Sequence, residues 1–411
     1  MREREAAKQA AKRILGEPGL NLEKLKKELS VSFRIQALSN SSILREIPKN
    51  KRSHEVLKLL KLRPVRTVSG IASIAVMSKP SPCPGECIYC PGGTESPKSY
   101  TGDEPAAMRG KQNDFDPFKQ VSARLRQLSE IGHTVDKCEL IIMGGTFNSR
   151  PLEYQRSFVK GCLDAMNGKK SKSLEEAKRK NERANVRAVG ITFETRPDYA
   201  KRKNISEMLE LGGTRVELGV QTLSDQVYKK VNRGHKVEDV VLATRLCKDS
   251  ALKVCYHIMP GLFSSPKKDV GMFRKLFKDS RFRPDMLKIY PCMVVKGTKL
   301  YDMWKRGEYE PYDTETASEV LAQATKFIPP YVRIMRVQRD IPLPRIEAGV
   351  RNSNLRQIVE KKLWERGERC ACIRCRESGL RELKGGGRAD PALAKLCRLD
   401  YEASGGGGDV P

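Results

Sequence analysis

Strand-length apolar runs alternate with amphipathic helical stretches through the middle of this 411-residue chain. This alternation of strands and helices is the feature that limits the possible folds, because strand–helix–strand units build parallel sheets with right-handed crossovers. Six such units are too few for a closed eight-stranded barrel, so we predict a partial (βα)6 barrel of the α/β class. The predicted strands are residues 71–77, 139–143, 188–193, 215–220, 254–259 and 286–290, and the predicted helices include residues 118–131, 198–211, 237–248 and 268–278.

Three cysteines follow the first predicted strand, in the run Cys83-Pro-Gly-Glu-Cys87-Ile-Tyr-Cys90. Parallel barrels carry their reactive groups on the loops after the strands, so a reactive centre is expected here. Three thiolates at this spacing can hold three irons of a [4Fe-4S] cluster and leave the fourth iron open to a small molecule. Structural zinc normally takes four protein ligands, and no fourth cysteine or histidine lies close in sequence. A disulfide framework would need an oxidising compartment.

The cysteine run resembles that of radical S-adenosylmethionine (SAM) enzymes, in which SAM chelates the open iron and is cleaved to a carbon radical. Tyr89 matches the aromatic residue near the adenine in that superfamily, and Gly144-Gly145 after the second strand matches a pair that approaches the SAM amino group. Three polar residues follow later strands and resemble the SAM-contacting set of the coproporphyrinogen-oxidase-like branch: Glu194, Gln221 and Arg233. The alternative for each of these residues alone is an ordinary ion pair at the rim of the barrel. We assign no catalytic residue, and His257 after the fifth strand is given no role.

The chain is strongly basic, with 78 Lys and Arg against 50 Asp and Glu and a net charge of +28. An excess of this size favours polyanions such as nucleic acid, because each neutralised phosphate releases a counterion. Residues 1–66 hold 17 basic against 7 acidic residues in a helical pattern that ends at Arg63-Pro-Val-Arg66, and we predict a tRNA-binding region there. A second basic stretch, residues 169–180, contains Glu175 and Glu176 and also reads as an exposed helix with internal ion pairs.

A second cysteine cluster lies near the C-terminus, where Cys370-Ala-Cys372-Ile-Arg-Cys375 is followed by Cys397. Three closely spaced thiolates and a fourth farther along the chain suit a tetrahedral zinc site. The alternatives are a second iron–sulfur cluster and free buried cysteines. Residues 404–411 are glycine-rich, which is typical of a flexible tail. The predicted organisation is therefore a basic helical region (1–66), the barrel (67–345), a helical and zinc-binding knuckle (346–403) and the tail (404–411).

Residues 65 to 404 together resemble the catalytic subunit of Elongator in its archaeal form, a family of radical SAM tRNA acetyltransferases. The stretches that carry the resemblance are Cys87-Ile-Tyr-Cys-Pro-Gly-Gly93, Ser99-Tyr-Thr-Gly-Asp-Glu-Pro105, Ile142-Met-Gly-Gly-Thr-Phe147, Phe193-Glu-Thr-Arg-Pro-Asp-Tyr199, Val231-Asn-Arg-Gly-His235, Arg333-Ile-Met-Arg-Val-Gln-Arg-Asp-Ile-Pro342 and Cys375-Arg-Glu377.

The resemblance implies modification of the wobble uridine of tRNA. SAM cleavage would yield a 5′-deoxyadenosyl radical, which takes hydrogen from the methyl group of acetyl-CoA; the resulting carbon radical adds to C5 of the uridine, and hydrolysis from CoA leaves a carboxymethyl group. The family places a lysine near acetyl-CoA at the position of Lys137. Family members continue into an acetyltransferase domain, whereas this sequence stops in glycines, so we expect this chain to be incomplete for acetyl transfer.

Two other functions fit the same sequence, namely a radical SAM RNA-modifying reaction without acyl-CoA and a non-catalytic tRNA-binding scaffold. The expected partners are tRNA, acetyl-CoA and an electron donor, and a homodimer or Elongator-like partner subunits are left open. No apolar run approaches the about 20 residues that span a bilayer, and the opening Met-Arg-Glu-Arg-Glu is no export signal. We therefore expect a cytoplasmic protein without a membrane partner and with reduced thiols.

Overall fold

A computed structural model describes residues 2–17, 19–35, 38–60, 64–92, 95–404 and 406–410 of the chain. Arg63 and Gly93, which belong to motifs named above, lie outside these residues. No helix among the described residues combines the length and the apolar character needed to cross a lipid bilayer.

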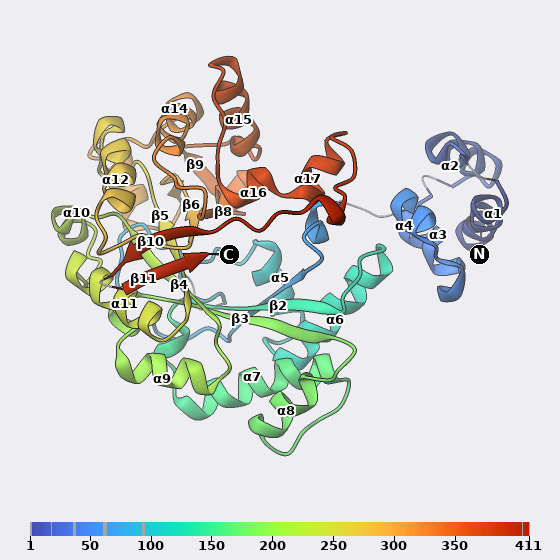
Figure 1. Ribbon diagram of the computed structural model, residues 1–411, viewed down its shortest axis with the longest axis horizontal. Coiled ribbons are helices and arrows are strands. Elements are labelled where there is room, and N and C mark those ends of the chain that lie inside the picture. Colours follow the sequence, from blue (N-terminus) through green and yellow to red (C-terminus); the bar gives the residue numbers. More distant parts are fainter. Residues whose placement is uncertain are drawn as a thin grey trace.

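One curled sheet of seven parallel strands forms the centre of the molecule (Figure 1). Its strand order, β1-β2-β3-β4-β5-β6-β8, follows the chain, as expected for a barrel that stays open between its first and last strands. This confirms the predicted partial barrel, and the six predicted strands match within two residues at each end. The strands are β1 (Ala72–Met77), β2 (Lys137–Met143), β3 (Arg187–Thr195), β4 (Arg215–Gln221), β5 (Lys253–Ile258), β6 (Met286–Ile289) and β8 (Arg333–Val337).

Helices cover the outer face of this sheet (Figure 1). Their first turns carry the expected signals: in α6, Asp116 accepts a hydrogen bond from the Lys119 amide and Pro117 stands at the first helical position. The barrel helices are α5 (Pro105–Gln112), α6 (Pro117–Glu130), α7 (Leu152–Asn167), α8 (Leu174–Asn181), α9 (Arg202–Glu210), α10 (Asp225–Lys230), α11 (Val237–Asp249), α12 (Pro266–Lys278), α13 (Lys299–Lys305) and α14 (Thr314–Thr325).

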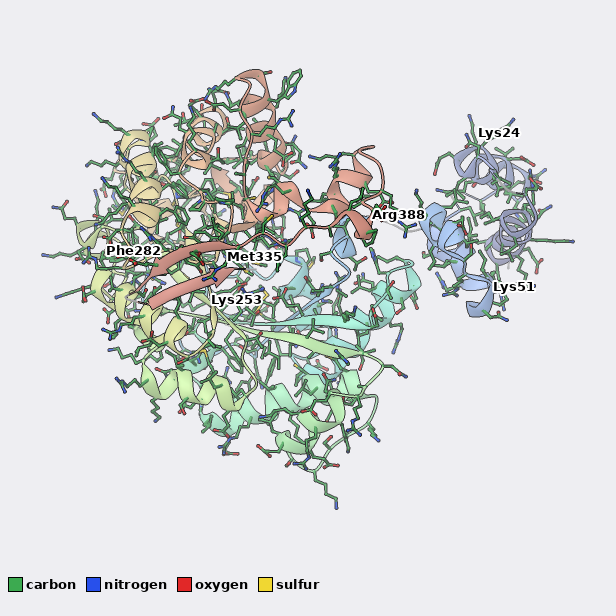
Figure 2. The ribbon with its side chains drawn as sticks, viewed as in Figure 1. Lys24, Lys51, Lys253, Phe282, Met335 and Arg388 are labelled. Atoms are coloured by element: carbon green, nitrogen blue, oxygen red, sulfur yellow. The ribbon has the colours of Figure 1, made fainter. Side chains whose placement is uncertain are left out.

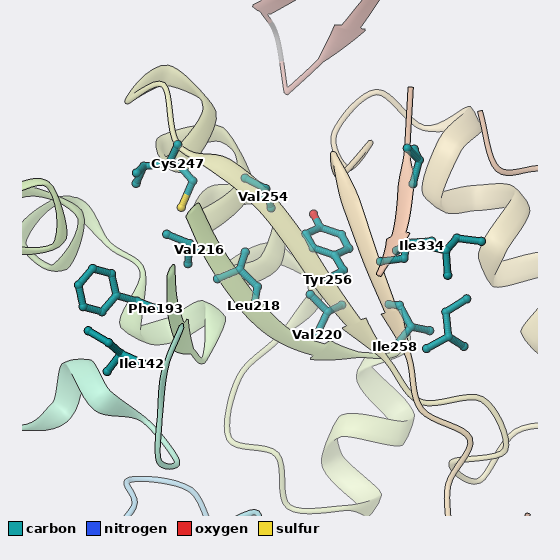
Figure 3. Packing of buried hydrophobic residues seen from close by; sticks show 14 of the residues in the cluster. Ile142, Phe193, Val216, Leu218, Val220, Cys247, Val254, Tyr256, Ile258 and Ile334 are labelled. Carbon is teal, nitrogen blue, oxygen red and sulfur yellow. The ribbon is translucent and has the colours of Figure 1, made fainter. Parts of the chain in front are cut away.

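The two faces of the sheet differ sharply in polarity. In β4, Val216, Leu218 and Val220 are fully buried in the main apolar core, which lies between the sheet and the helices (Figure 3). Side chains alternate along a strand, so Arg215, Glu217, Gly219 and Gln221 must face the inside of the barrel. β5 repeats the pattern, with Val254, Tyr256 and Ile258 in the core and His257 between them. The curled sheet thus encloses a polar interior.

Four α-helices among the described residues precede the barrel: α1 (Arg2–Gly16), α2 (Leu22–Ser32), α3 (Asn40–Glu46) and α4 (His54–Leu60). They bury their own apolar cluster, in which Ala6, Ala10 and Ile14 of α1 repeat at the four-residue spacing of one helix face. Figure 2 shows the Lys24 and Lys51 side chains on the outside of this unit. The N-terminal region is therefore helical with exposed lysines, and its binding of tRNA stays a prediction.

The segment after β8 docks onto the barrel. It contains β9 (Ile346–Ala348), which pairs with β7 (Val294–Val295), then α15 (Leu355–Glu365), α16 (Ile373–Arg376) and α17 (Ser378–Leu383). The glycine-rich end differs from the expected flexible tail. There β11 (Gly406–Val410) pairs antiparallel with β10 (Leu399–Ala403), and Tyr401 of β10 stacks on Tyr331 at 4.0 Å between ring centroids. A glycine strand can form here because its partner strand supplies the backbone hydrogen bonds.

Candidate active site

The three clustered cysteines lie at the carboxyl ends of the strands, on the loop after β1. Cys83, Cys87 and Cys90 are half-buried and line one cavity together with residues from the ends of β2, β3, β4, β5 and β6. Backbone hydrogen bonds hold the loop: the Ile88 amide donates to the Val231 carbonyl at 3.1 Å, and the Leu300 amide donates to the Ile88 carbonyl at 2.9 Å. Burial raises the pKa of the Cys90 thiol to about 11, with the neighbouring Cys87 adding to the shift.

Arg233 reaches the cysteine loop from the turn after α10. Its Nη1 donates a hydrogen bond to the Cys87 sulfur at 3.2 Å, and its Nη2 donates to the Gly219 carbonyl. A Cβ at Gly219 would lie 2.7 Å from that Nη2, so a larger residue in β4 would displace the guanidinium. Burial alone would lower the pKa of Arg233, but Tyr89 and Cys87 outweigh it and raise the pKa, so the residue stays charged.

Most of the other predicted SAM-contacting residues lie at the same cavity. Tyr89, Gly145, Glu194 and Gln221 all line it. Gln221 ends β4 with a left-handed φ of 71°, where the β4–β5 register shifts, and this turn brings its side chain to the cavity. Gly144 has a φ of 132°, and a Cβ there would lie 2.1 Å from the Ser78 hydroxyl, so only glycine fits this turn.

Several buried polar atoms on the wall of this cavity lack a hydrogen-bond partner among the described residues. Such groups are costly unless a ligand or water satisfies them. They include both donors and acceptors, which suits a ligand with amine, carboxylate and hydroxyl groups. The atoms are Tyr89 Oη, Thr195 Oγ1, Arg196 Nη1, Gln221 Oε1 and Arg233 Nε. The residues present therefore fit an iron–sulfur cluster with SAM beside it.

A chain of charged side chains crosses the barrel interior below the cysteines. Lys288 of β6 pairs with Glu194 of β3 at 3.3 Å and, more closely, with Glu217 of β4. Glu217 also contacts His257 at 2.9 Å and Arg215 at 3.3 Å. Burial would raise the pKa of Glu217, but Lys288, His257 and Arg215 outweigh it and hold that pKa well below its usual range.

Sequence reasoning missed most of this interior. The sequence-based prediction gives His257 no role and names neither Lys288 nor Tyr100 as a site residue, although all three line the cavity. The Tyr100 hydroxyl donates to Glu194 Oε2 at 2.7 Å, and its pKa is raised well above the usual value by burial and by that carboxylate. One signal was available: a lysine within the apolar strand Met286-Leu-Lys-Ile289 must either face a polar interior or find a buried partner.

The C-terminal cysteines form a second group with different geometry. Cys370, Cys372 and Cys375 have their sulfurs within 4.8 Å of one another, and the Cys372 and Cys375 sulfurs are 3.6 Å apart. Thiolates around one tetrahedral zinc, at about 2.3 Å from the metal, lie about 3.8 Å apart. The group therefore suits a single ion. Cys397 is exposed and outside the group, contrary to the predicted fourth ligand.

Lys137 is not brought to the cavity. It is exposed at the first residue of β2, whereas Met143 at the other end of that strand lines the cavity. Six residues of extended chain separate the two by about 20 Å. A contact between Lys137 and acetyl-CoA stays a prediction, and it would have to be made at the opposite end of the sheet.

Comparison with known proteins identifies the family. Residues 80–277 match the model of the radical SAM superfamily, and residues 284–365 match the radical SAM C-terminal domain. The chain is 52% identical over 394 residues to a tRNA uridine(34) acetyltransferase of Methanocaldococcus infernus, covering 94% of this chain and 74% of that protein. It is 40% identical over 400 residues to human Elongator complex protein 3, covering 94% and 73% respectively.

A solved structure agrees with these relatives. The archaeal Methanocaldococcus infernus Elp3, with residues 1–46 deleted, superposes with a TM-score of 0.74 at 49% identity, covering 83% of this chain and 73% of that one. The cysteine loop, the parallel half-barrel and this similarity agree. The chain therefore belongs to the radical SAM family that comprises the tRNA uridine(34) acetyltransferases and Elongator complex protein 3.

Proposed function

We propose that this protein is a radical SAM enzyme that modifies the wobble uridine of tRNA, forming a carboxymethyl group at C5 from SAM and acetyl-CoA. One observation carries the proposal: Cys83, Cys87 and Cys90 converge on a cavity whose buried polar atoms lack partners among the described residues. The substrate is inferred from the Methanocaldococcus infernus relative, whose name specifies uridine 34 of tRNA.

The roles at the cavity follow from the side chains. Cys83, Cys87 and Cys90 would hold a [4Fe-4S] cluster, which when bound supplies the electron that cleaves SAM. Tyr89, Gly144 and Gly145 would lie against the adenine and the amino group of SAM. Glu194, Gln221 and Arg233 would bind its hydroxyl, amine and carboxylate groups. The curled sheet around the cavity would limit the access of water to a reactive radical.

The acetyl group of acetyl-CoA would reach this cavity from a binding site outside the barrel. The family resemblance places acetyl-CoA in an acetyltransferase domain, and Lys137 is the residue of this chain that the resemblance puts near it. An electron donor is the remaining partner. Other subunits are consistent with the Elongator name of the human relative.

tRNA would bind first through the helical unit α1–α4. Its surface carries most of the excess charge of residues 1–66, and several of its basic residues, such as Lys24 and Lys51, are exposed. Specific RNA recognition usually targets single-stranded loops with splayed bases, and an anticodon loop is one. A wobble base would have to leave its stack to reach the cavity.

Zinc is proposed for the C-terminal thiols, with Cys370, Cys372 and Cys375 as three ligands. Cys372 is fully buried in the main core, and the Ile373 amide donates to the Val332 carbonyl at 3.0 Å beside β8. A metal here would fasten the segment after β8 to the barrel. Structural zinc normally takes four ligands, so a donor other than these three cysteines would have to fill the fourth position.

The proposal is tested with anaerobically reconstituted protein supplied with reductant, SAM, acetyl-CoA, unmodified tRNA and the acetyltransferase domain of a family member, since the resemblance implies that acetyl transfer needs that domain. Nucleoside analysis of the recovered tRNA should show carboxymethyluridine, and Cys87→Ser should abolish it while Cys162→Ala, a buried core cysteine, retains it. 5′-Deoxyadenosine without any modified nucleoside would leave SAM cleavage standing and overturn the acetyl-CoA part. Neither product from the wild type would overturn the whole proposal.

A further inference from the structure

Two buried carboxylates lie directly beside each other in the barrel. Glu194 of β3 and Glu217 of β4 are register partners on adjacent parallel strands, and both face the interior. Glu217 is fully buried, and the Glu194 residue is 8% exposed. Like charges side by side on neighbouring strands repel, and burial strengthens the repulsion. A cation between the two carboxylates would relieve this repulsion.

Lys288 provides that cation. Its ammonium contacts both carboxylates, and it stands next to His257 on the register of β5 and β6. Burial would lower the pKa of Lys288, but the two carboxylates outweigh this and raise it, so the side chain remains charged. The ammonium also argues against a metal in the nearby Glu217, Cys255 and His257 group, because it already occupies the Glu217 carboxylate.

The two carboxylates depend on Lys288 unequally. Glu217 has His257 and Arg215 as further partners. Among the described residues, Glu194 has two partners: Lys288 on Oε1 and Tyr100 on Oε2. A carboxylate has about four lone-pair sites, so these two contacts fix its orientation and still leave sites open toward the cavity.

We propose that Lys288 is a positioning residue for SAM binding, which acts by holding the Glu194 carboxylate in the orientation that meets the ligand. The inference rests on the proposed contact between Glu194 and SAM. Lys288 itself need not touch SAM. Its ammonium forms an ion pair with Glu217, and Glu217 forms a second ion pair with Arg215. Arg215 in turn pairs with Glu139 of β2. The orientation of the Lys288 ammonium is therefore set by strands on both sides of the site.

The test measures SAM affinity by anaerobic equilibrium dialysis of the reconstituted holoprotein. Lys288→Met should weaken SAM binding about tenfold or more. Lys288→Met also leaves two adjacent buried carboxylates without their shared cation, which could destabilise the fold. The variant Lys288→Met/Glu217→Gln, which removes one positive and one negative charge, is therefore measured as well. That variant should recover thermal stability but not SAM affinity, since Glu194 still lacks its ion pair with Lys288.

Lys248→Met is the matched control: Lys248 is also largely buried and pairs with Asp285 at 3.1 Å, outside the cavity. It should leave SAM affinity within twofold.

A double-mutant cycle separates positioning from general structure. If Lys288 acts through Glu194, then in the Glu194→Gln background the Lys288→Met change should alter SAM affinity by less than about threefold. Equal losses in both backgrounds would overturn the inference, as would a stable Lys288→Met/Glu217→Gln variant that binds SAM like the wild type. Failure of the wild type itself to bind SAM would instead refute the proposed function.

Discussion

The guanidinium of Arg233 donates a hydrogen bond to the sulfur of Cys87 at 3.2 Å, across 146 positions of sequence. The sequence predicts Arg233 as one of the residues that contact SAM. Its position beside a proposed cluster ligand adds a second role, because a cation and a hydrogen bond at a cluster thiolate favour the more negative, reduced cluster.

Arg233→Met should therefore shift the reduction potential of the reconstituted cluster to a more negative value. It should also weaken SAM binding about tenfold, through loss of a buried charge-assisted contact. A redox titration followed by electron paramagnetic resonance checks the first effect. Arg245→Met removes an exposed arginine on α11 and should change neither quantity. An unchanged potential in Arg233→Met would show that the contact with Cys87 does not tune the cluster.

Metal analysis of cysteine variants tests which of the C-terminal cysteines bind zinc. Purified wild-type protein should carry zinc, and Cys372→Ser should lose it and unfold roughly 5 °C lower, since a loss of about 2 kcal/mol corresponds to several degrees in a domain of this size. Cys397→Ser should keep its zinc, because Cys397 is exposed and outside the thiol group. Loss of zinc from both variants would restore the fourth ligand predicted from the spacing.

The salt dependence of tRNA binding tests the basic helical unit. Replacing Lys24, Lys27 and Lys51 by alanine should lower the slope of log affinity against log salt by about 2, given about 0.7 to 0.9 per lost phosphate contact. The matched control replaces Lys169, Lys170 and Lys172, which changes the net charge equally in a segment next to Glu175 and Glu176. Equal slopes for the two triple variants would mean that α1–α4 is not the contact surface.

His235 should make the stability of the fold depend on pH. Its side chain is fully buried, with Asp198 at 3.6 Å and the Tyr228 ring at 4.6 Å, and it faces the charges of Arg233 and Arg196. Burial lowers its pKa from 6.5, partly opposed by Asp198. The unfolded chain then binds the proton more readily, so folding stability falls as the pH drops below 6.5.

His235→Gln should flatten this dependence. The measurement is the melting temperature of the wild type and the variant from about pH 8 to about pH 5.5, a range above the titration of ordinary carboxyl groups. The wild-type melting temperature should decline toward the acid end, and that of the variant should decline less. Parallel curves would show that another group carries the effect.

Much of the fold could be predicted because the buried strands are strongly apolar. The missed strand, β8, shows the limit: in Arg333–Val337 only Ile334 is buried, so polar residues interrupt the run and no apolar stretch marks it. The glycine strand β11 was missed for a related reason, since its pairing depends on β10 rather than on its own side chains.

The site was predictable where residues directly follow strands, as Glu194 and Gln221 do. The interior contacts were not, because strand register decides them. That Glu194 and Glu217 become neighbours, and that Lys288 reaches both, follows from how β3, β4 and β6 align. Conversely, Cys397 was grouped with the other thiols by spacing alone, and the path of the chain takes it elsewhere.

Iron analysis and electron paramagnetic resonance of anaerobically purified protein test whether Cys83, Cys87 and Cys90 hold a [4Fe-4S] cluster that binds SAM. We expect about four irons per chain. We also expect a reduced-cluster signal that changes when SAM is added, and the loss of both the iron and the signal in Cys83→Ser, Cys87→Ser and Cys90→Ser. Zinc or no metal at these cysteines, or a cluster signal that SAM does not change, would refute the radical SAM mechanism.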